Sequence, residues 1–285
     1  MSPLKDLKVV ELARILAGPW IGQTLSDLGA DVTKIESPEG DDTRKWGPPF
    51  VEKDGDRSAA YFHGCNRGKT SISVDLKNPE GIETVKALVK DADIFIENFK
   101  VGGLAKYGLD YETLCALNPR LIYCSVTGFG QQGPLAHLPG YDFLLQGMSG
   151  LMSVTGEPDR PPQKVGVAVT DIVTGLYGTI GILSAVEQRH TTGRGQHIDM
   201  SLLDCATALL ANQNMNFLAS GESPSRIGNA HPNICPYDVF ETSDGHIILA
   251  VGNDGQFQRC CDVLDVSFLS SDARFETNQA RVRNR

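Results

Sequence analysis

Asp171 is the side chain in this 285-residue sequence whose type and position best suit covalent chemistry. It stands in Val169-Thr170-Asp171-Ile172, where an apolar run turns into a predicted helix. A carboxylate can attack a thioester to give a mixed anhydride, and the returning thiolate then gives an enzyme-bound thioester. This chemistry needs no metal and no redox cofactor, but it requires that water be excluded because the anhydride hydrolyses easily. From residue types alone, a helix cap or a first-turn carboxylate that matches the helix dipole is the favoured role.

Four basic residues near the ends of predicted strands or helices are candidates for contacts with phosphate groups: Arg67, Lys69, Lys77 and Lys106. In an acidic chain, a few local cations can hold an anionic ligand through charge-assisted hydrogen bonds. Taken one at a time, such residues are more often solvated surface charges.

The segment Gly128-Phe129-Gly130-Gln131-Gln132-Gly133 matches G-x-G-x-x-G after a predicted strand. In dinucleotide-binding proteins this pattern opens a helix whose amino end meets the pyrophosphate. Here Pro134 and Pro139 follow instead, and we expect a loop over the sheet rather than a dinucleotide site. The sequence holds no H-x-x-x-H, C-x-x-C or G-x-S-x-G, so it predicts neither a metal site nor a hydrolase nucleophile.

The bulk properties narrow the class of protein. The net charge of −9 and the pI near 5.2 disfavour a general nucleic-acid binder, which usually carries a basic face. The seven cysteines are odd in number and have no metal-ligand spacing, so we expect reduced thiols in the cytoplasm, or in the mitochondrial matrix of a eukaryote. The amino terminus shows no apolar signal core, and we predict no membrane span.

The elements that position these residues alternate between strand and helix. Strands are predicted at 7–12, 31–35, 70–76, 93–97, 121–126 and 196–200, with helices at 19–28, 78–89, 111–117, 141–151, 171–187 and 202–218. This repeated order predicts an α/β fold with a doubly wound, mostly parallel, Rossmann-like sheet. A polar, turn-rich stretch at 220–232 indicates a linker, and 239–241 with 246–251 reads as a hairpin. We predict a large domain at 1–221, and at 222–285 a linker with the beginning of a smaller α+β domain.

Several motifs occur in a fixed order along the chain. They include Leu16-Ala17-Gly18-Pro19, Asp27-Leu28-Gly29-Ala30-Asp31, Asn66-Arg67-Gly68-Lys69-Thr70, Glu97-Asn98-Phe99, the Gly128–Gly133 segment and Thr192-Gly193-Arg194-Gly195-Gln196. From Leu4 to the last residue the sequence resembles the class III CoA-transferase, or CaiB/BaiF, family. Trp46-Gly47-Pro48-Pro49-Phe50 and His231-Pro232 make it similar to the succinyl-CoA:dicarboxylate transferases, especially the glutarate type.

The resemblance implies roles for individual residues and reverses the interpretation of Asp171, which takes the position of the family nucleophile. Asp142 takes the position of an acidic residue that assists the chemistry. Coenzyme A contacts are implied at Ile15, Leu16, Ala17, Lys77, Asn98, Phe99, Lys106 and Tyr107. Trp46 and Tyr61 fall near the acceptor pocket, Tyr141 lies beside the acid, and Arg44 is a candidate partner for a distal carboxylate.

The family further implies an interlocked homodimer with sites between subunits, and acyl-CoA and a small carboxylic acid as ligands, with no permanently bound cofactor. Family chains continue past Arg285, so the rest of the small domain is expected to be absent here. Ser37 and Pro139 replace basic residues found in some members.

Two other functions stay open. An α-methylacyl-CoA racemase is a relative on the same fold, but its catalytic histidine aligns with Tyr141, and a phenol with a pKa near 10 is a poor base. A truncated, non-catalytic CoA-binding paralogue is the other alternative. Within the leading hypothesis, backbone N–H groups near Gly128–Gly130 are candidates to stabilise the oxyanion.

Overall fold

The computed structural model describes residues 2–53 and 55–285. Its centre is a parallel six-stranded sheet with the order β5-β2-β1-β6-β7-β8. The strands are β1 (Lys8–Leu12), β2 (Asp31–Glu36), β5 (Thr70–Ser73), β6 (Ile94–Glu97), β7 (Ile122–Thr127) and β8 (His197–Ser201). The prediction of a doubly wound α/β fold is confirmed.

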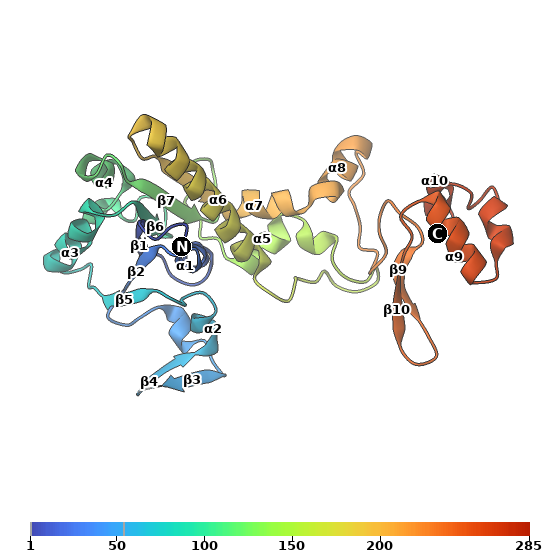
Figure 1. The fold of residues 1–285 in the computed structure, drawn as a ribbon, viewed down its shortest axis with the longest axis horizontal. Helices are drawn as coiled ribbons and strands as arrows, with labels where there is room; N and C mark the ends of the chain where they lie inside the picture. The colour runs from blue at the N-terminus through green and yellow to red at the C-terminus, as the bar shows by residue number, and fades with distance from the viewer. Residues whose placement is uncertain (1, 54) are drawn as a thin grey trace. The chain divides into compact units, whose positions relative to one another are not determined.

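Helices cover both faces of this sheet (Figure 1). Strand residues alternate between two cores, as period-two side chains must. One core joins the sheet to α1 (Ala17–Asp27), α6 (Val169–Thr192) and α7 (Leu202–Leu209). The other core joins it to α3 (Pro79–Lys90) and α4 (Tyr111–Leu117). Burial on both faces explains why the interior strands β6 and β7 are almost entirely buried and rich in apolar residues.

Local sequence accounts for the helix ends. The side chain of Asn78 accepts a hydrogen bond from the Glu80 amide and Pro79 follows as the first helical residue, as predicted for α3. Helix α6 ends at Gly193, which has a φ of 70°. A glycine adopts this left-handed conformation without steric cost, so the helix stops there.

The strand order reverses between β1 and β6. The chain leaves β1 toward β2 on one side, whereas β6 continues toward β7 on the other. In open parallel sheets, such a reversal leaves a crevice beyond the carboxyl ends of the two strands, where ligands bind. The residues that follow β1 and β6 are therefore candidates for a ligand-binding site.

Smaller elements lie between the strands and helices of the first unit along the chain. They are η1 (Asp42–Lys45), β3 (Phe50–Lys53), β4 (Asp56–Ala59), α2 (Ala60–His63), η2 (Ala105–Tyr107) and α5 (Asp142–Met148). The β3–β4 pair is antiparallel and was not predicted, because its strands are short, charged and mostly exposed.

Backbone contacts divide the chain into two units. The first comprises residues 1–149 and 166–211, and the second residues 150–165 and 212–285. The second unit contains the predicted hairpin, as β9 (Tyr237–Glu241) and β10 (His246–Ala250). Its other elements are η3 (Leu151–Ser153), nearly all of α8 (Ala211–Ser220), α9 (Asp254–Val263), η4 (Ser267–Ser271) and α10 (Asn278–Arg283). The domain boundary expected between residues 221 and 222 stays a prediction.

The single helix expected over 202–218 is wrong. Helix α7 ends at Leu209, and α8 (Ala211–Ser220) begins at Ala211, whose φ is 40°. A residue with positive φ cannot continue a right-handed helix. The two segments also differ in burial, since α7 buries Leu202, Cys205 and Ala206 whereas no described residue of α8 is buried.

Helix α6 is, by length and composition, long and apolar enough to cross a membrane. One of its faces packs closely on α1, where Gly175 and Gly178 leave no room for a side chain. A Cβ on Gly175 would lie 2.8 Å from Trp20 Cβ, and one on Gly178 would lie 2.5 Å from Ile21 Cδ1. The apolar character of this helix is therefore used, on that face, for packing inside the protein.

Candidate active site

A cavity of about 370 Å³ lies beyond the carboxyl ends of β1, β6 and β7, where the strand order reverses. Asp171 lines it, from the first turn of α6. The other predicted site residues along it are Ile15, Leu16, Ala17, Asn98, Phe99, Lys106, Tyr107 and Tyr141. Nine predicted site residues from five separate stretches of the chain thus meet around one hollow.

The electrostatic setting of Asp171 is unusual for an aspartate. Burial, followed by the negative charge of Asp142, raises the pKa of Asp171 to about 7. A carboxylate that loses its water and faces a second carboxylate holds its proton longer. Such a perturbed acid in a cleft is a candidate for catalysis.

Asp142 fixes the beginning of the helix that carries Asp171. Its Oδ1 accepts hydrogen bonds from the Thr170 amide at 2.9 Å and from Thr170 Oγ1 at 2.5 Å. Its Oδ2 accepts one from Gln146 Nε2 at 2.8 Å. No side chain at the N-cap position itself, Ala168, caps α6, so the carboxylate of α5 supplies this function.

Hydrogen bonds join the turn after β1 to the turn after β6. The Asn98 amide group accepts from the Arg14 backbone N–H at 3.0 Å and donates to the Arg14 carbonyl at 2.6 Å. The Phe99 amide donates to Glu97 Oε2 at 2.7 Å. Asn98, expected from the family resemblance to contact coenzyme A, thus also binds the neighbouring loop. On the same wall, Lys106 Nζ lies 4.7 Å from the centre of the Tyr107 ring.

Lys77 lies in a second hollow of about 490 Å³, which shares Arg14, Phe99 and Tyr107 with the first. The two hollows therefore adjoin, and their linings include the basic residues Lys77 and Lys106 and the aromatic rings of Phe99 and Tyr107. The second hollow is also lined by five acidic residues, namely Glu36, Glu39, Asp41, Asp42 and Asp75, so its lining does not by itself indicate an anionic ligand.

The residues expected at the acceptor pocket, Trp46, Tyr61 and Arg44, line neither of these two hollows. Trp46 and Tyr61 pack edge to face, with ring centroids 5.3 Å apart. Burial, then the charges of Asp171, Cys65 and Asp142, raises the pKa of Tyr61 to about 12, which places the phenol within electrostatic reach of Asp171. Arg44 donates hydrogen bonds to the Glu36 carboxylate from Nη2 at 2.6 Å and from Nε at 2.7 Å, and its guanidinium group lies over the Phe62 ring.

The expectation that Lys69 contacts a phosphate is wrong, because its side chain is 1% exposed and forms an ion pair with Glu11. Of the backbone N–H groups near Gly128–Gly130, that of Gly130 already donates to Thr127 Oγ1. The segment after β7 opens no helix before α5, so the predicted loop is confirmed.

Sequence reasoning missed the partners of Lys69. Glu11 and Lys34 occupy facing positions on β1 and β2, and the side chains of both are at most 1% exposed. The sequence offered one indication, namely ionisable residues inside otherwise apolar strands. Among the residues that the structure describes, no three His, Cys, Asp or Glu side chains gather in a way that could hold a metal ion.

Comparison with known proteins identifies the family. The profile of CoA-transferase family III matches residues 4–285. A succinate–glutarate CoA-transferase of Agrobacterium fabrum is 62% identical over 99% of this chain and 72% of its own length. A mouse succinyl-CoA:glutarate CoA-transferase is 43% identical over 100% of this chain and 65% of its own. The crystal structure of a CaiB/BaiF family protein from Brucella suis matches with a TM-score of 0.88 and 65% identity, over 99% of this chain and 75% of that one.

The chain therefore belongs to CoA-transferase family III. The resemblance drawn from its ordered motifs is confirmed. The chain spans about two thirds to three quarters of the length of these relatives.

The raised pKa of Asp171 predicts how replacing this carboxyl group changes the free energy of unfolding. Between about pH 4 and pH 7 the unfolded carboxyl, with a pKa of 3.8, has lost its proton while the folded one keeps it. This group's contribution to stability therefore falls as pH rises through that window and stays low above it. We expect Asp171→Asn to raise the free energy of unfolding at pH 8 by about 1–3 kcal/mol and to change it little at pH 4.

Urea denaturation of the wild type and the variant at pH 4, 6 and 8 measures this effect. The exposed carboxylate of Asp6 provides the control, since Asp6→Asn should show no pH-dependent gain. An Asp171→Asn protein that is no more stable than the wild type at pH 8 would contradict the electrostatic account of this site.

Proposed function

We propose that this chain transfers coenzyme A from an acyl-CoA donor, succinyl-CoA foremost, to a small carboxylic acid through covalent intermediates on Asp171. The observation that carries the proposal is the position of Asp171 on the cavity also lined by Ile15–Ala17, Asn98 and Phe99. A nucleophile at the crevice of a CoA-binding fold lies where the thioester end of the ligand would arrive.

Each step is a nucleophilic acyl substitution. An Asp171 carboxylate oxygen attacks the donor carbonyl, the C–S bond breaks, and the thiolate of coenzyme A leaves a mixed anhydride behind. The thiolate then attacks the aspartyl carbonyl, releasing the donor acid and forming an aspartyl thioester. The acceptor carboxylate attacks the carbonyl of the aspartyl thioester, the C–S bond breaks, and a second mixed anhydride forms as the thiolate is released. The thiolate then attacks the acceptor's carbonyl in this anhydride, so that the new acyl-CoA departs and the Asp171 carboxylate is restored.

The proton state of Asp171 sets the working range of this cycle. With a pKa of about 7, the side chain is a nucleophile only in its ionised form, so turnover should rise with pH through neutrality. Partial burial of the carboxylate also serves the chemistry, because a poorly hydrated carboxylate is more reactive and its anhydride meets less water.

The relatives support dicarboxylic acids as substrates. Two of them act, by name, on succinate or succinyl-CoA and glutarate, at 62% and 43% identity. A racemase is less well supported, because none of the described residues lining the Asp171 cavity is a histidine. Tyr141, where the racemase histidine would stand, is 63% exposed.

Loss of the nucleophile tests the mechanism. We expect Asp171→Ala to lower the rate of CoA transfer by at least ~10³-fold, because both covalent intermediates need the carboxylate. Mass spectrometry of the wild type after mixing with succinyl-CoA should find coenzyme A attached to the peptide that carries Asp171. Near-normal transfer by the variant, or an adduct on another peptide, would refute the mechanism.

The acceptor acid can be identified with a panel of glutarate, oxalate, malate, itaconate and carnitine, each assayed with succinyl-CoA and acetyl-CoA as donor. We expect glutarate with succinyl-CoA to give the highest kcat/KM. Deuterium exchange at the α-carbon of a branched acyl-CoA, without transfer to any acid, would favour the racemase instead.

A homodimer is part of the proposal. Helices α5 and α6 pack together in the first unit and expose several large apolar side chains, namely Phe143, Leu144, Met148, Leu176, Tyr177 and Ile180. Clusters of this kind on a protein surface mark interfaces, and a second copy of the chain is the partner that the family suggests.

Light scattering should give twice the 30.8 kDa mass of one chain. Ile180→Lys, in the middle of this face and 58% exposed, should shift the equilibrium toward the monomer. A monomeric wild type at micromolar concentration would contradict the dimer without bearing on Asp171.

A further inference from the structure

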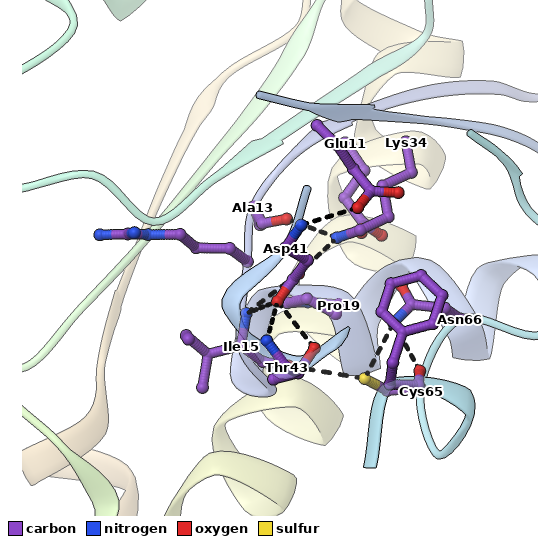
Figure 2. Close-up of polar contacts among 12 residues, drawn as sticks. Glu11, Ala13, Ile15, Pro19, Lys34, Asp41, Thr43, Cys65 and Asn66 are labelled. Carbon is purple, nitrogen blue, oxygen red and sulfur yellow. Dashed lines mark hydrogen bonds and ion pairs between the residues drawn. The ribbon is translucent and has the colours of Figure 1, made fainter. Parts of the chain in front are cut away.

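The turn between β1 and α1 is held by side chains from distant parts of the first unit. Its Ile15 amide lies 3.3 Å from Asp41 Oδ2, and its Ile15 carbonyl accepts a bond from Cys65 Sγ at 3.6 Å. Asn98 binds the backbone of Arg14 in both directions. Figure 2 shows Asp41 and Cys65 converging on this turn from different segments. Hydrogen bonds from Asp41, Cys65 and Asn98 thus fix the position of the backbone that lines the Asp171 cavity.

Behind the turn lies a group of four buried charges, Glu11, Lys34, Asp41 and Lys69, which we call the charge clamp. Lys34 Nζ lies 3.1 Å from Glu11 Oε1 and 3.0 Å from Asp41 Oδ2. Lys69 Nζ lies 2.8 Å from Glu11 Oε2. All four side chains are at most 1% exposed. The two positive and two negative charges compensate one another.

The clamp reaches the turn through backbone carbonyls as well. Lys34 Nζ donates to the Ala13 carbonyl at 2.8 Å, just before the turn. Lys69 Nζ donates to the Pro19 carbonyl at 2.8 Å, in the first turn of α1. The two lysines of the clamp therefore bind the chain on both sides of Ile15, and Asp41 binds Ile15 itself.

Stability alone does not account for this arrangement. Burying four charges is costly, and apolar side chains of similar volume usually stabilise a core as well or better. The surroundings of Glu11 are also tightly packed, because a Cβ atom on Gly22 would lie 1.8 Å from Glu11 Oε2. What the clamp does achieve is a defined position for the turn it surrounds.

The turn needs such support. Ile15 has a φ of 73°, a left-handed conformation that a β-branched side chain seldom adopts. This conformation costs on the order of 1–2 kcal/mol and persists only where the surroundings impose it. Strained residues of this kind concentrate at functional sites, and Ile15 lines the cavity that contains Asp171.

We infer that Glu11, Lys34, Asp41 and Lys69 are positioning residues, which hold the Ala13–Ala17 backbone in the strained shape that receives coenzyme A beside Asp171. The inference rests on the proposed function for the identity of the ligand. None of the four residues lines the cavity that contains Asp171, so they act on that cavity through the shape of the turn. Their loss should therefore weaken the binding of coenzyme A, beyond any loss of stability.

Asp41→Asn tests this directly, because the shape of the side chain is kept while one of its two acceptor oxygens is lost. The new amide group then faces the Ile15 N–H or Lys34, both of which are donors. We expect the Kd for coenzyme A, measured by calorimetry, to rise tenfold or more, and kcat/KM for the acyl-CoA to fall by up to ~10²-fold.

The control is Asp93→Asn, which breaks the ion pair with the buried Arg189 at 2.8 Å, at the amino end of β6 and thus the opposite edge of the sheet; Asp93 itself is half-buried. Asp93→Asn should lower stability but leave the Kd for coenzyme A unchanged. If both variants lose stability and neither changes this Kd, the clamp is purely structural and the inference is wrong.

A double variant separates positioning from general damage. Glycine adopts positive φ without cost, so Ile15→Gly should restore part of the coenzyme A affinity of Asp41→Asn while not improving that of the wild type. Absence of any such recovery would argue against the inference.

If Asp41→Asn fails to fold, Cys65→Ala removes a contact to Ile15 without unpairing a buried charge, and it should still raise the Kd measurably. An unchanged Kd in that variant would overturn the inference. Because binding is measured without turnover, these results stay distinct from a failure of the Asp171 mechanism, which the adduct experiment reports.

Discussion

The reversal of strand order between β1 and β6 is the constraint on which the site depends. Parallel strands end at one edge of the sheet, and the connections that leave β1 and β6 in opposite directions keep the space between them open. The turns after these strands become the walls of a cavity, and α6 carries Asp171 to its rim. Because both faces of the sheet are buried under helices, that edge is rigid, and a ligand there meets a preformed surface.

Within this crevice, electrostatics sets the character of the two aspartates. Asp142 accepts hydrogen bonds from Thr170 and Gln146, which fix the beginning of α6. Asp171 follows Thr170 on that helix, and burial together with the charge of Asp142 raises its pKa to about 7. Asp142 is thus engaged in holding α6, whereas Asp171 lines the cavity. The environment of each, rather than its residue type, makes the difference.

Much of this architecture could be predicted from the sequence, because the interior strands β1, β6 and β7 are rich in apolar residues and the helices carry recognisable caps such as Asn78 and Pro79. The sheet, the hairpin at 237–250 and the loop after β7 followed from such local patterns. Asp171 did not, since a first-turn aspartate looks like any other cap, and its role came from the family resemblance. The pairing of Lys69 with Glu11 and Lys34 was missed because residue type alone does not reveal burial. The break at Ala211 was missed because Leu210 and Ala211 both favour helices, and nothing in the residue types there indicates a positive φ.

The central claim is that coenzyme A lies along the turn after β1 with its sulfur at Asp171. A crystal structure of the protein with coenzyme A bound tests it most directly. The account predicts that the pantetheine arm runs past Ile15–Ala17, between this turn and Asn98–Phe99, and that the sulfur lies in contact with the Asp171 carboxylate. Coenzyme A bound elsewhere, or bound in the cavity with its sulfur turned away from Asp171, would contradict the account.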